Sequence, residues 1–470
     1  MDLPRLVIAG NVSGAGKTTI ALGLMAALRS CGLRVQPFKC GPDYIDPAFH
    51  YYACGRSSRN IDSWLLSRNS MIDLVARAGV GVDVAVIEGL MGLYDGRSGL
   101  GPEGSTAEIA KWLRAPVLLV IDISRTAQSA GAIAMGYQEF DREVQIIGAV
   151  LNNAMGPTHL ARATESVEAG AGLPVLGHVV YDPAITLPEA HPTLMPPSDR
   201  EELLPRVERT RAALEATVDV DALLKAMRSA WPLPHIAGGG PFPSVSRPPS
   251  ARIALLRDEA FDLYQPDNLD LLTAWGAELV PTSPLHDDAL PPGVDGIYVG
   301  PGFPEVHLPA LAANESFLQS LRVMAEEGVQ VYGECGGLAY LTEGIVDREG
   351  MRHRLAGLIP AWCRMGDHGV RIGYALATVN KDNLIARHGR RVRGHEFYWA
   401  DADLPEEQAA YHIVDPEERL EGYAQGNVLA SRLRLHFGSD ASLARNFVDR
   451  CTRKTGARTK SPSRTANKPS

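Results

Sequence analysis

Short apolar runs alternate with stretches of helical period along most of the chain. In the first half these runs occupy residues 6–8, 84–87, 117–121 and 146–151. Continuous apolar runs that are separated by helices are typical of a parallel sheet buried on both faces. The pattern therefore predicts an α/β domain over residues 1–231.

The alternation stops at residue 232 and resumes at residue 251. Residues 232–250 are rich in Pro, Gly and Ser without an apolar period, which indicates a linker. Further apolar runs occupy residues 252–256, 277–280, 296–299 and 329–332. They predict a second α/β domain over residues 251–450. Residues 451–470 carry basic side chains, no acidic ones and no apolar anchor, so we expect a disordered basic tail.

Composition narrows the class of protein. A length of 470 residues exceeds the roughly 100 to 200 that one domain usually holds, which agrees with two domains. The net charge of −9 argues against a nucleic-acid binder, which normally presents a basic surface. No run reaches the roughly 18 apolar residues of a membrane span and no secretory signal begins the chain, so we expect a cytoplasmic protein without a membrane partner. Six cysteines without a CxxC pair suggest neither a zinc site nor disulfides.

A glycine-rich loop joins the first apolar run to a helical stretch. Small residues such as Gly14 and Gly16 let backbone N–H groups close around phosphate oxygens at a helix N-terminus. Lys17 would then reach the outer phosphates of ATP, and Thr18 would bind Mg²⁺. Thr19 completes the predicted ATP-binding loop. A purely structural turn is the alternative, which Gly-Lys-Thr in this strand-loop-helix setting disfavours.

The spacing of this loop departs from the common GxxxxGK[ST] pattern. Gly10 lies one residue too far back, and Asn11 stands where the first glycine belongs. The longer loop resembles that of dethiobiotin synthetase, an ATPase that phosphorylates a carboxyl group. Val12 stands where partition-type ATPases carry a signature lysine, which disfavours that family.

Acidic residues near two strand ends are candidate metal ligands. Glu88 follows the apolar run 84–87 and is the candidate for Mg²⁺, with a helix cap as the alternative. Asp43 and Asp46 lie on a Pro-bounded loop, where they would hold a second metal or contact substrate. Ordinary turn chemistry explains those two aspartates equally well. Tyr44, on the same loop, is assigned to the substrate.

Cys335 is the candidate nucleophile. It follows the apolar run 329–332 and is flanked by Gly333, Gly336 and Gly337. A nucleophile on a sharp strand-to-helix turn needs such small neighbours, because the turn forces strained dihedral angles. The helix N-terminus is also expected to lower the pKa of the thiol. An inert core cysteine is the alternative.

Thioester chemistry at Cys335 requires a base and an oxyanion site. His436 ends a late strand about a hundred residues downstream and is the best candidate for the base. The N–H groups of Gly336 and of Gly302 are candidate oxyanion donors. Taken alone, a strand-end histidine is more often structural, but its pairing with Cys335 favours catalysis.

In combination, these motifs resemble the cobyrinic acid a,c-diamide synthase family from about residue 6 to residue 448. The resemblance implies an N-terminal P-loop, dethiobiotin-synthetase-like domain and a C-terminal class I-like glutaminase domain. It also implies a carbon–nitrogen ligase that amidates the a and c carboxylates of a corrinoid in cobalamin biosynthesis, with ATP and L-glutamine as co-substrates and Mg²⁺ as cofactor. Cys335 and His436 would form its glutaminase centre. The segments that carry the resemblance are SGAGKTT, QPFKCGPDYIDPAFH, SRNIDSW, VIEGLMGLYDG, NLDLL, LAANESF, YGECGGLAYL, GHEFYWA and LHFGSD.

The chain also departs from the family pattern. Gly438 stands where class I glutaminases carry a glutamate. The branch that contains cobyrinic acid synthases similarly lacks this glutamate, so the third triad residue is left open. Pro301 replaces a glycine and has no N–H, so the oxyanion donor must be Gly302 or a neighbour. His395 and Glu396 match the glutaminase end of the family, and we expect them near the domain interface in contact with substrate or glutamine.

Three alternatives stay open at this point. The macrocycle could be hydrogenobyrinic acid or nickel sirohydrochlorin instead of cobyrinic acid. A different class of function is a nucleotide-binding scaffold with an inactive glutaminase domain, against which intact Cys335 and His436 count. The oligomeric state, including a homodimer, is also open.

Overall fold

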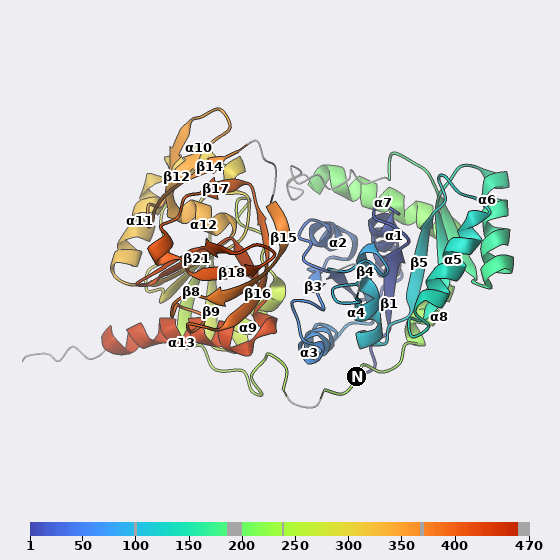
Figure 1. Cartoon of the computed structure of the whole chain (residues 1–470), viewed down its shortest axis with the longest axis horizontal. Helices are drawn as coiled ribbons and strands as arrows, with labels where there is room; N and C mark the ends of the chain where they lie inside the picture. The colour runs from blue at the N-terminus through green and yellow to red at the C-terminus, as the bar shows by residue number, and fades with distance from the viewer. Residues whose placement is uncertain (98–100, 186–199, 237–238, 367–370, 459–470) are drawn as a thin grey trace, which may run out of the picture. The chain divides into compact units, whose positions relative to one another are not determined.

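The computed structural model describes residues 1–97, 101–185, 200–236, 239–366 and 371–458. Contacts divide the chain into two compact units, Met1–Gly240 and Pro241–Ser470. The division falls within the stretch 232–250 that the sequence suggests as a linker. Figure 1 shows the chain with the elements of both units labelled.

The first unit is built on a single seven-stranded sheet. Every strand pair in it is parallel, in the order β3-β2-β4-β1-β5-β6-β7, so the central strand β1 lies between β4 and β5. This arrangement confirms the parallel sheet predicted from the apolar runs. The strands are β1 (Arg5–Gly10), β2 (Val35–Cys40), β3 (Arg59–Ile61), β4 (Val84–Gly92), β5 (Val117–Asp122), β6 (Ile146–Ala154) and β7 (Val175–Val180).

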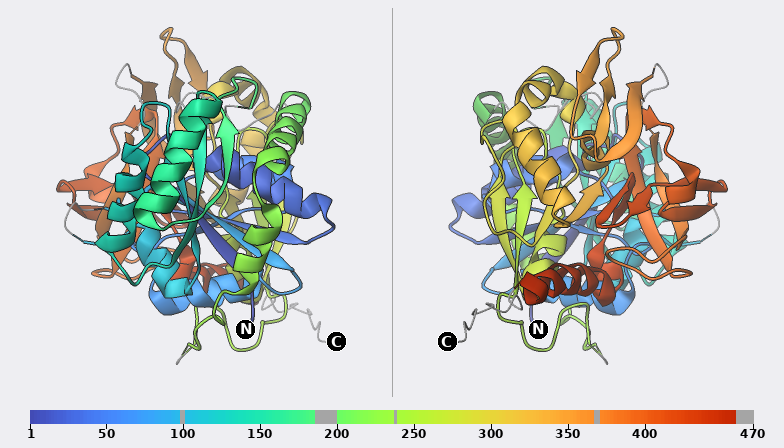
Figure 2. Two further views of the ribbon diagram at one scale, coloured as in Figure 1. Left: turned by 90° about the vertical axis from the view of Figure 1, so that its right-hand side faces the viewer. Right: turned by 90° about the vertical axis from the view of Figure 1, so that its left-hand side faces the viewer.

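Helices cover both faces of this sheet (Figures 1 and 2). They are α1 (Lys17–Ser30), α2 (Asp46–Cys54), α3 (Arg68–Ala78), α4 (Thr106–Leu113), α5 (Ser129–Phe140), α6 (Pro157–Glu165), α7 (Arg200–Thr217) and α8 (Val220–Arg228), with a π-helical turn η1 (Ser166–Gly170). Helix α1 contacts α2, α7 and α8, and its residues Ile20–Leu28 are buried against Leu6 and Ile8 of β1. The loop between β1 and α1 is therefore anchored at both ends by core packing.

The second unit is also a mixed α/β fold, with a six-stranded sheet in the order β20-β21-β11-β10-β8-β9. All pairs in it are parallel except β20–β21, which is antiparallel. Its strands are β8 (Ala251–Leu256), β9 (Ala277–Thr282), β10 (Gly296–Val299), β11 (Gln330–Glu334), β20 (Tyr423–Gln425) and β21 (Val428–Ser431). Its helices are α9 (Pro266–Ala274), α10 (Leu308–Ala313), α11 (Glu315–Glu326), α12 (Gly336–Leu341) and α13 (Ala441–Arg458), with 3₁₀ turns η2 (Pro304–Val306), η3 (Glu406–Gln408) and η4 (Phe437–Ser439).

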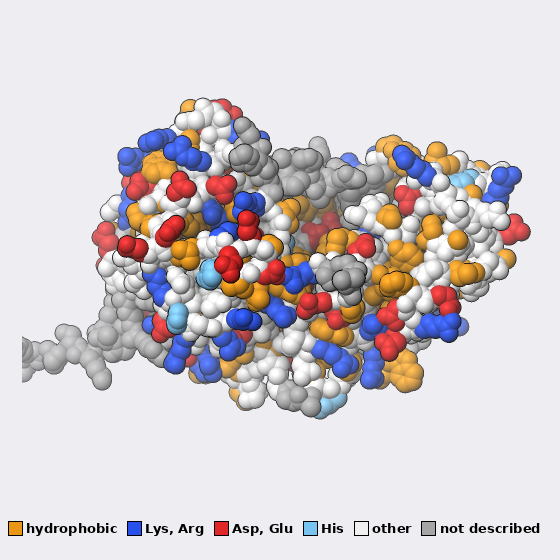
Figure 3. Space-filling view, viewed as in Figure 1, with side chains coloured by type: hydrophobic (Ala, Val, Ile, Leu, Met, Phe, Trp, Pro, Cys, Tyr) orange, Lys and Arg blue, Asp and Glu red, His pale blue; other side chains and the backbone are white. Residues whose placement is uncertain are grey.

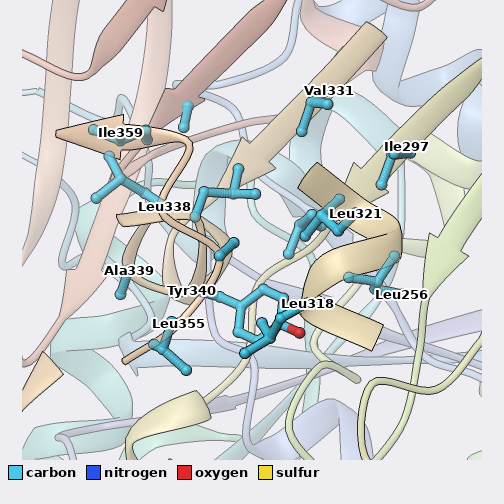
Figure 4. Packing of buried hydrophobic residues seen from close by; sticks show 14 of the residues in the cluster. Leu256, Ile297, Leu318, Leu321, Val331, Leu338, Ala339, Tyr340, Leu355 and Ile359 are labelled. Atoms are coloured by element: carbon cyan, nitrogen blue, oxygen red, sulfur yellow. The ribbon is translucent and has the colours of Figure 1, made fainter. Parts of the chain in front are cut away.

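Two further sheets belong to this unit, with the orders β13-β12-β14-β17 and β19-β18-β15-β16-β22. Their strands are β12 (Thr342–Val346), β13 (Arg352–Arg354), β14 (Ile359–Met365), β15 (Arg371–Val379), β16 (Arg391–Tyr398), β17 (Ala400–Ala402), β18 (Tyr411–Asp415), β19 (Arg419–Glu421) and β22 (Leu433–Leu435). The central strand β11 leads into α12, and Figure 4 shows Leu338, Ala339 and Tyr340 of that helix packed with side chains of α11 and of the six-stranded sheet. This packing fixes the turn between β11 and α12.

Helix α13 overlaps the predicted tail. It runs to Arg458, so it includes the first residues of the stretch 451–470. Cys451 is fully buried with Phe447 and Val448 in the core beneath β8, because the apolar face of the helix continues past residue 450. The remaining tail residues, 459–470, lie outside the described residues.

Within the part of the chain that the structure describes, no helix is both long enough and apolar enough to cross a membrane. On the face seen in Figure 3, Lys and Arg side chains are interspersed with Asp and Glu side chains.

Candidate active sites

The loop after β1 adopts a conformation that only its glycines allow. Gly14 has φ 76° and Gly16 has φ 91°, in the left-handed region that favours glycine. A Cβ atom on Gly16 would also lie 2.1 Å from Nδ2 of Asn152, whose amide donates a hydrogen bond to the carbonyl of Ala15 at 2.9 Å. The loop therefore ends at the N-terminus of α1 with its backbone close-packed, which suits an anion.

Lys17 opens α1 and crosses the loop. Its Nζ donates to the carbonyl of Val12 at 3.2 Å, and the side chain is 7% exposed. Burial, with a contribution from the Lys39 ammonium, lowers the pKa of Lys17 to about 8. A polyphosphate on the loop would favour the charged form of this side chain. Thr18 and Thr19 follow in the first turn of α1, and the Thr18 hydroxyl donates to Oε1 of Glu88 at 2.6 Å.

Glu88 lies within β4 and not at its end, because the strand continues to Gly92. The carboxylate is fully buried, and its partners are the Thr18 hydroxyl, Nζ of Lys39 at 2.8 Å and Nε2 of His50 at 2.6 Å. Burial alone raises the pKa of Glu88, but the Lys39 ammonium and the hydrogen bond to His50 outweigh it and hold the pKa below its usual value. Glu88 is thus an ionised member of the loop site and not a helix cap.

Lys39, on β2, is the central cation of a buried group of charged side chains, which we call the Lys39 cluster. Its other members are Asp43, Asp46, His50 and Glu88. Nζ of Lys39 lies 2.5 Å from Oδ2 of Asp46 and 3.6 Å from Oδ2 of Asp43, in addition to its contact with Glu88. Burial lowers the pKa of Lys39, but the surrounding carboxylates outweigh burial and hold it well above the usual value. Sequence reasoning gave no role to Lys39 or His50, although both stand in the segment QPFKCGPDYIDPAFH.

The two loop aspartates differ in role. Asp43 Oδ1 accepts hydrogen bonds from the N–H groups of Ile45 (2.8 Å) and Asp46 (3.2 Å), which is the turn chemistry considered as its alternative. Asp46 begins α2 and directs its carboxylate at Lys39. Tyr44 between them is buried, with 7% exposure. Among the described residues, no group of three or more His, Cys, Asp and Glu side chains is arranged to hold a metal ion.

Loss of the Lys39 ammonium is expected to destabilise the first unit. The variant Lys39→Met leaves buried carboxylates without their cation, which typically costs about 3 to 5 kcal/mol. The deficit should shrink as pH falls, because protonation removes the uncompensated negative charge. Denaturant unfolding at several pH values measures both effects. The control Lys111→Met breaks a partly exposed pair with Asp141 and should cost less than about 1 kcal/mol, so equal costs for the two variants would contradict the prediction.

In the second unit, Cys335 occupies the turn between β11 and α12 with φ 57° and ψ −115°. A Cβ atom on Gly336 would lie 2.4 Å from the carbonyl oxygen of Gly302, and one on Gly337 would lie 2.1 Å from that of Val299. The strained turn therefore exists, and the glycines after the cysteine are required by close approach to the neighbouring strand end.

The Cys335 thiol is buried, and its surroundings favour the protonated form. It donates to the carbonyl of Phe397 at 2.5 Å, and burial raises its pKa to about 12. The charge of Arg434 and a backbone hydrogen bond from Gly336 oppose this rise but do not cancel it. The expectation of a lowered pKa is therefore wrong here, because desolvation outweighs the effect of the short helix that follows.

His436 directly follows β22 and is 1% exposed. Its Nδ1 accepts from the N–H of Gly438 at 3.1 Å, and its Nε2 lies 3.8 Å from Oδ2 of Asp267. The preceding residue, Leu435, donates its N–H to Oε1 of Glu334 at 2.8 Å, which joins the His436 segment to the residue before Cys335. The structure thus brings the two segments together, although the thiol donates to Phe397 and not to His436.

The start of α9 holds the His436 segment in place. Asn268 donates to the carbonyl of Leu435 at 2.8 Å and accepts from the N–H of Phe437 at 2.7 Å. Asp267, beside it, is 2% exposed and faces the imidazole. Sequence reasoning missed both residues, because they lie about 170 positions from His436 and belong to a different element.

A small cavity opens beside the Cys335 thiol. The candidate oxyanion residues Gly302 and Gly336 both line it, with charged groups from Glu305 and Arg432. Gly302 cannot carry a side chain, since a Cβ atom there would lie 1.9 Å from the carbonyl oxygen of Ala260. The last part of β16 and the residues after it line the cavity too, namely Phe397, Tyr398, Trp399 and Ala400.

His395 and Glu396 do not line this cavity, although they precede Phe397 on β16. The His395 ring packs edge-on against Tyr374 with 5.6 Å between centroids, and Glu396 accepts a hydrogen bond from Arg419. Both side chains are buried.

Comparison with known protein families supports a function for each unit. The model for the CobQ/CobB/MinD/ParA nucleotide binding domain matches residues 6–194, and that for the CobB/CobQ-like glutamine amidotransferase domain matches residues 252–442. Together with the fold, these matches define a carbon–nitrogen ligase of the glutamine amidotransferase type that carries a nucleotide-binding domain.

Relatives over nearly the whole length give the family. The cobyrinate a,c-diamide synthase of Dehalococcoides mccartyi (strain CBDB1) is 42% identical over 462 residues, which cover 96% of this chain and 100% of the relative. Those of Priestia megaterium and Methanosarcina acetivorans are 37% and 38% identical, and cover 96% and 95% of this chain and 98% and 95% of the relatives. The chain belongs to the cobyrinate a,c-diamide synthase family, which confirms the resemblance found in the sequence.

Proposed function

We propose that the chain amidates the a and c side-chain carboxylates of cobyrinic acid, using ATP to form acyl phosphates and ammonia released from glutamine. The main support for this proposal is that one chain combines a glycine-constrained loop ending at Lys17 with a strained strand-to-helix turn at Cys335. The names of the relatives supply the substrate. Cobalamin biosynthesis in the cytoplasm is the setting that follows.

The first unit would activate the carboxylate. Ammonia does not displace oxygen from a carboxylate, so the carboxylate must first attack the γ-phosphorus of ATP and release ADP. Lys17 would bind the outer phosphates and offset the charge that builds on them. Thr18 and Glu88 would hold Mg²⁺, since hydroxyl and carboxylate oxygens suit this ion and it usually takes few protein ligands beside phosphates and waters. When bound, Mg²⁺ offsets negative charge on the phosphates.

The Lys39 cluster would stand beside this loop. Lys39 keeps Glu88 ionised, and His50 fixes the second oxygen of the same carboxylate through its own hydrogen bond to Ser58 at 2.9 Å. Glu88 therefore offers a charged, oriented carboxylate to the first turn of α1. Asp46 would help to hold the Lys39 ammonium in place through its own ion pair with Nζ.

The second unit would release ammonia. When glutamine enters, the Cys335 thiol must leave Phe397 and give its proton to His436, and the sulfur then attacks the amide carbon. The N–H groups of Gly336 and Gly302 would stabilise the oxyanion. His436 returns the proton to the departing nitrogen, and water hydrolyses the thioester to glutamate. The ammonia then displaces phosphate from the acyl phosphate.

Two measurements test this function together. Purified enzyme is given cobyrinic acid, hydrogenobyrinic acid and nickel sirohydrochlorin in parallel, and diamide formation is followed by mass spectrometry. With ¹⁸O in the substrate carboxylates, one ¹⁸O should appear in phosphate for each amide formed. If the enzyme prefers another macrocycle, that macrocycle and not cobyrinic acid is the substrate. Unlabelled phosphate would contradict the formation of an acyl phosphate intermediate. Absence of glutaminase activity would favour the scaffold alternative.

Asp267 is expected to position His436 in place of the glutamate that is absent at Gly438. Replacing Asp267 by Asn removes the charge but keeps the shape, and should lower kcat for glutamine hydrolysis about 10²-fold with little change in KM. Asp267→Glu should restore part of the rate, and ammonia-dependent synthesis should be unaffected. The control Asp270→Asn lies on the exposed side of the same helix and should have no effect. A normal rate in Asp267→Asn would remove Asp267 from the glutaminase centre.

A further inference from the structure

Two oppositely charged side chains line the cavity beside Cys335, and thioester chemistry needs neither of them. Glu305 comes from the turn η2, which follows the oxyanion candidate Gly302. Arg432 comes from the junction of β21 and β22, four residues before His436. Both belong to the unit that carries the glutaminase centre. The surroundings of these two side chains indicate which kind of ligand they could bind.

The Glu305 carboxylate is buried without a partner on one oxygen. The residue as a whole is half-buried, but Oε2 is fully buried and has no hydrogen-bond partner among the described residues. Burial raises the pKa of Glu305 to about 7, and its charge in turn raises the pKa of the Cys335 thiol. An unpartnered buried carboxyl oxygen is costly, so a site of this kind calls for a cation or a hydrogen-bond donor.

The Arg432 guanidinium is held in place without an ion pair among the described residues, and its acidic neighbour, Glu421, is a buried carboxyl whose pKa burial raises. It is 9% exposed and lies 4.6 Å from the centre of the Tyr398 ring. Its Nη2 reaches the carbonyls of Ala400 and Ala402 at 3.5 Å each, which are long contacts, and it forms no ion pair with any residue in the described ranges. The stacked guanidinium is thus ordered and able to accept a carboxylate.

Aromatic rings supply the rest of the lining. Phe303 stacks on Trp399 with 4.9 Å between centroids and packs edge-on against Phe397 at 5.7 Å. The cavity volume is about 10 Å³, room for about one water molecule. A larger ligand therefore enters only when these rings move apart, and its aliphatic part would then lie against them.

We propose that Glu305 binds the α-ammonium group and Arg432 the α-carboxylate of L-glutamine, so that the side-chain amide is directed at Cys335. This assignment rests on the proposed glutaminase function and adds the residues that recognise the amino acid. A zwitterion with a short aliphatic chain matches a cavity that has one anionic group, one cationic group and aromatic walls. Neither charged residue takes part in a covalent step.

Two glutamine analogues separate the two contacts. Glutaramate lacks the α-amino group, and 4-aminobutanamide lacks the α-carboxylate, while both keep the amide. Hydrolysis of glutamine and of each analogue is measured with the full-length enzyme and with the variants Glu305→Gln and Arg432→Gln. Because each variant removes a single charged contact, its loss should be confined to compounds that carry the matching group.

The expected losses are directional. Glu305→Gln should lower kcat/KM about 10²-fold for glutamine and for 4-aminobutanamide, and by less than about 3-fold for glutaramate. Arg432→Gln should lower it about 10²-fold for glutamine and glutaramate, and by less than about 3-fold for 4-aminobutanamide. Glu349→Gln, on the exposed surface of the same unit, should change none of these values.

Other outcomes have distinct meanings. Equal losses for all three compounds would overturn the assignment and make Glu305 or Arg432 part of the proton transfer or of the folded scaffold. Ammonia-dependent synthesis reports folding of each variant, and if Glu305→Gln does not fold, Glu305→Ala with the same three compounds replaces it. If the unmutated enzyme hydrolyses glutamine and neither variant is impaired, this inference alone fails. If the unmutated enzyme does not hydrolyse glutamine, the proposed function fails first.

Discussion

Replacement of Cys335 by alanine is expected to abolish glutamine-dependent amidation, by at least about 10⁴-fold in kcat, because the proposed mechanism forms its thioester on this thiol. Alanine keeps the Cβ atom, so the turn with φ 57° and the packing of Gly336 against Gly302 are retained. Ammonium salts should therefore still support amidation at a rate within about 2-fold of the unmutated enzyme, since the first unit is unchanged. The two rates are measured on the same corrinoid with ATP.

The matched control for this variant is Cys363→Ala. Cys363 is also fully buried in the second unit, within its core, but lies on β14. It should keep both activities. Loss of ammonia-dependent amidation in Cys335→Ala would show that the cysteine is needed for more than glutamine hydrolysis and would contradict the division of labour between the units.

Replacement of Lys17 by alanine is expected to remove amidation with either nitrogen donor, by at least about 10³-fold. The Lys17 ammonium is the cation at the mouth of the glycine loop, and without it the charge that builds on the γ-phosphate has no counter-charge from α1. Glutamate release from glutamine should persist, because the Cys335 centre does not contain Lys17. Product amide and free glutamate are quantified in the same reaction mixture.

Lys111→Ala serves as the control, since Lys111 is a lysine of the same unit in a partly exposed ion pair. It should leave amidation unchanged. Survival of amidation in Lys17→Ala would remove the requirement for phosphoryl transfer at this loop.

The sequence predicted those features that a short stretch of chain determines. The loop at Gly14 and Gly16, and the turn at Cys335, depend on glycines whose positions are visible within about ten residues. The parallel sheet of the first unit was likewise visible, since each buried strand is a continuous apolar run.

Features that depend on distant parts of the chain were not predictable. Lys39 and His50 become partners of Glu88 only when β2, α2 and β4 are packed side by side. The pKa of the Cys335 thiol was predicted in the wrong direction, because burial is a property of the folded unit and outweighs the local helix end. The tail boundary was placed at residue 451 because basic residues follow it, whereas the burial of Cys451 with Phe447 and Val448 depends on the packing of the folded unit.

The hydrogen bond from the Cys335 thiol to the carbonyl of Phe397 also affects how the thiol reacts with oxidants. A buried, protonated thiol reacts slowly with oxidants and alkylating agents, because the thiolate is the reactive form. The proposed nucleophile is therefore expected to resist sulfenic acid formation until its amino-acid donor draws the thiol away from Phe397.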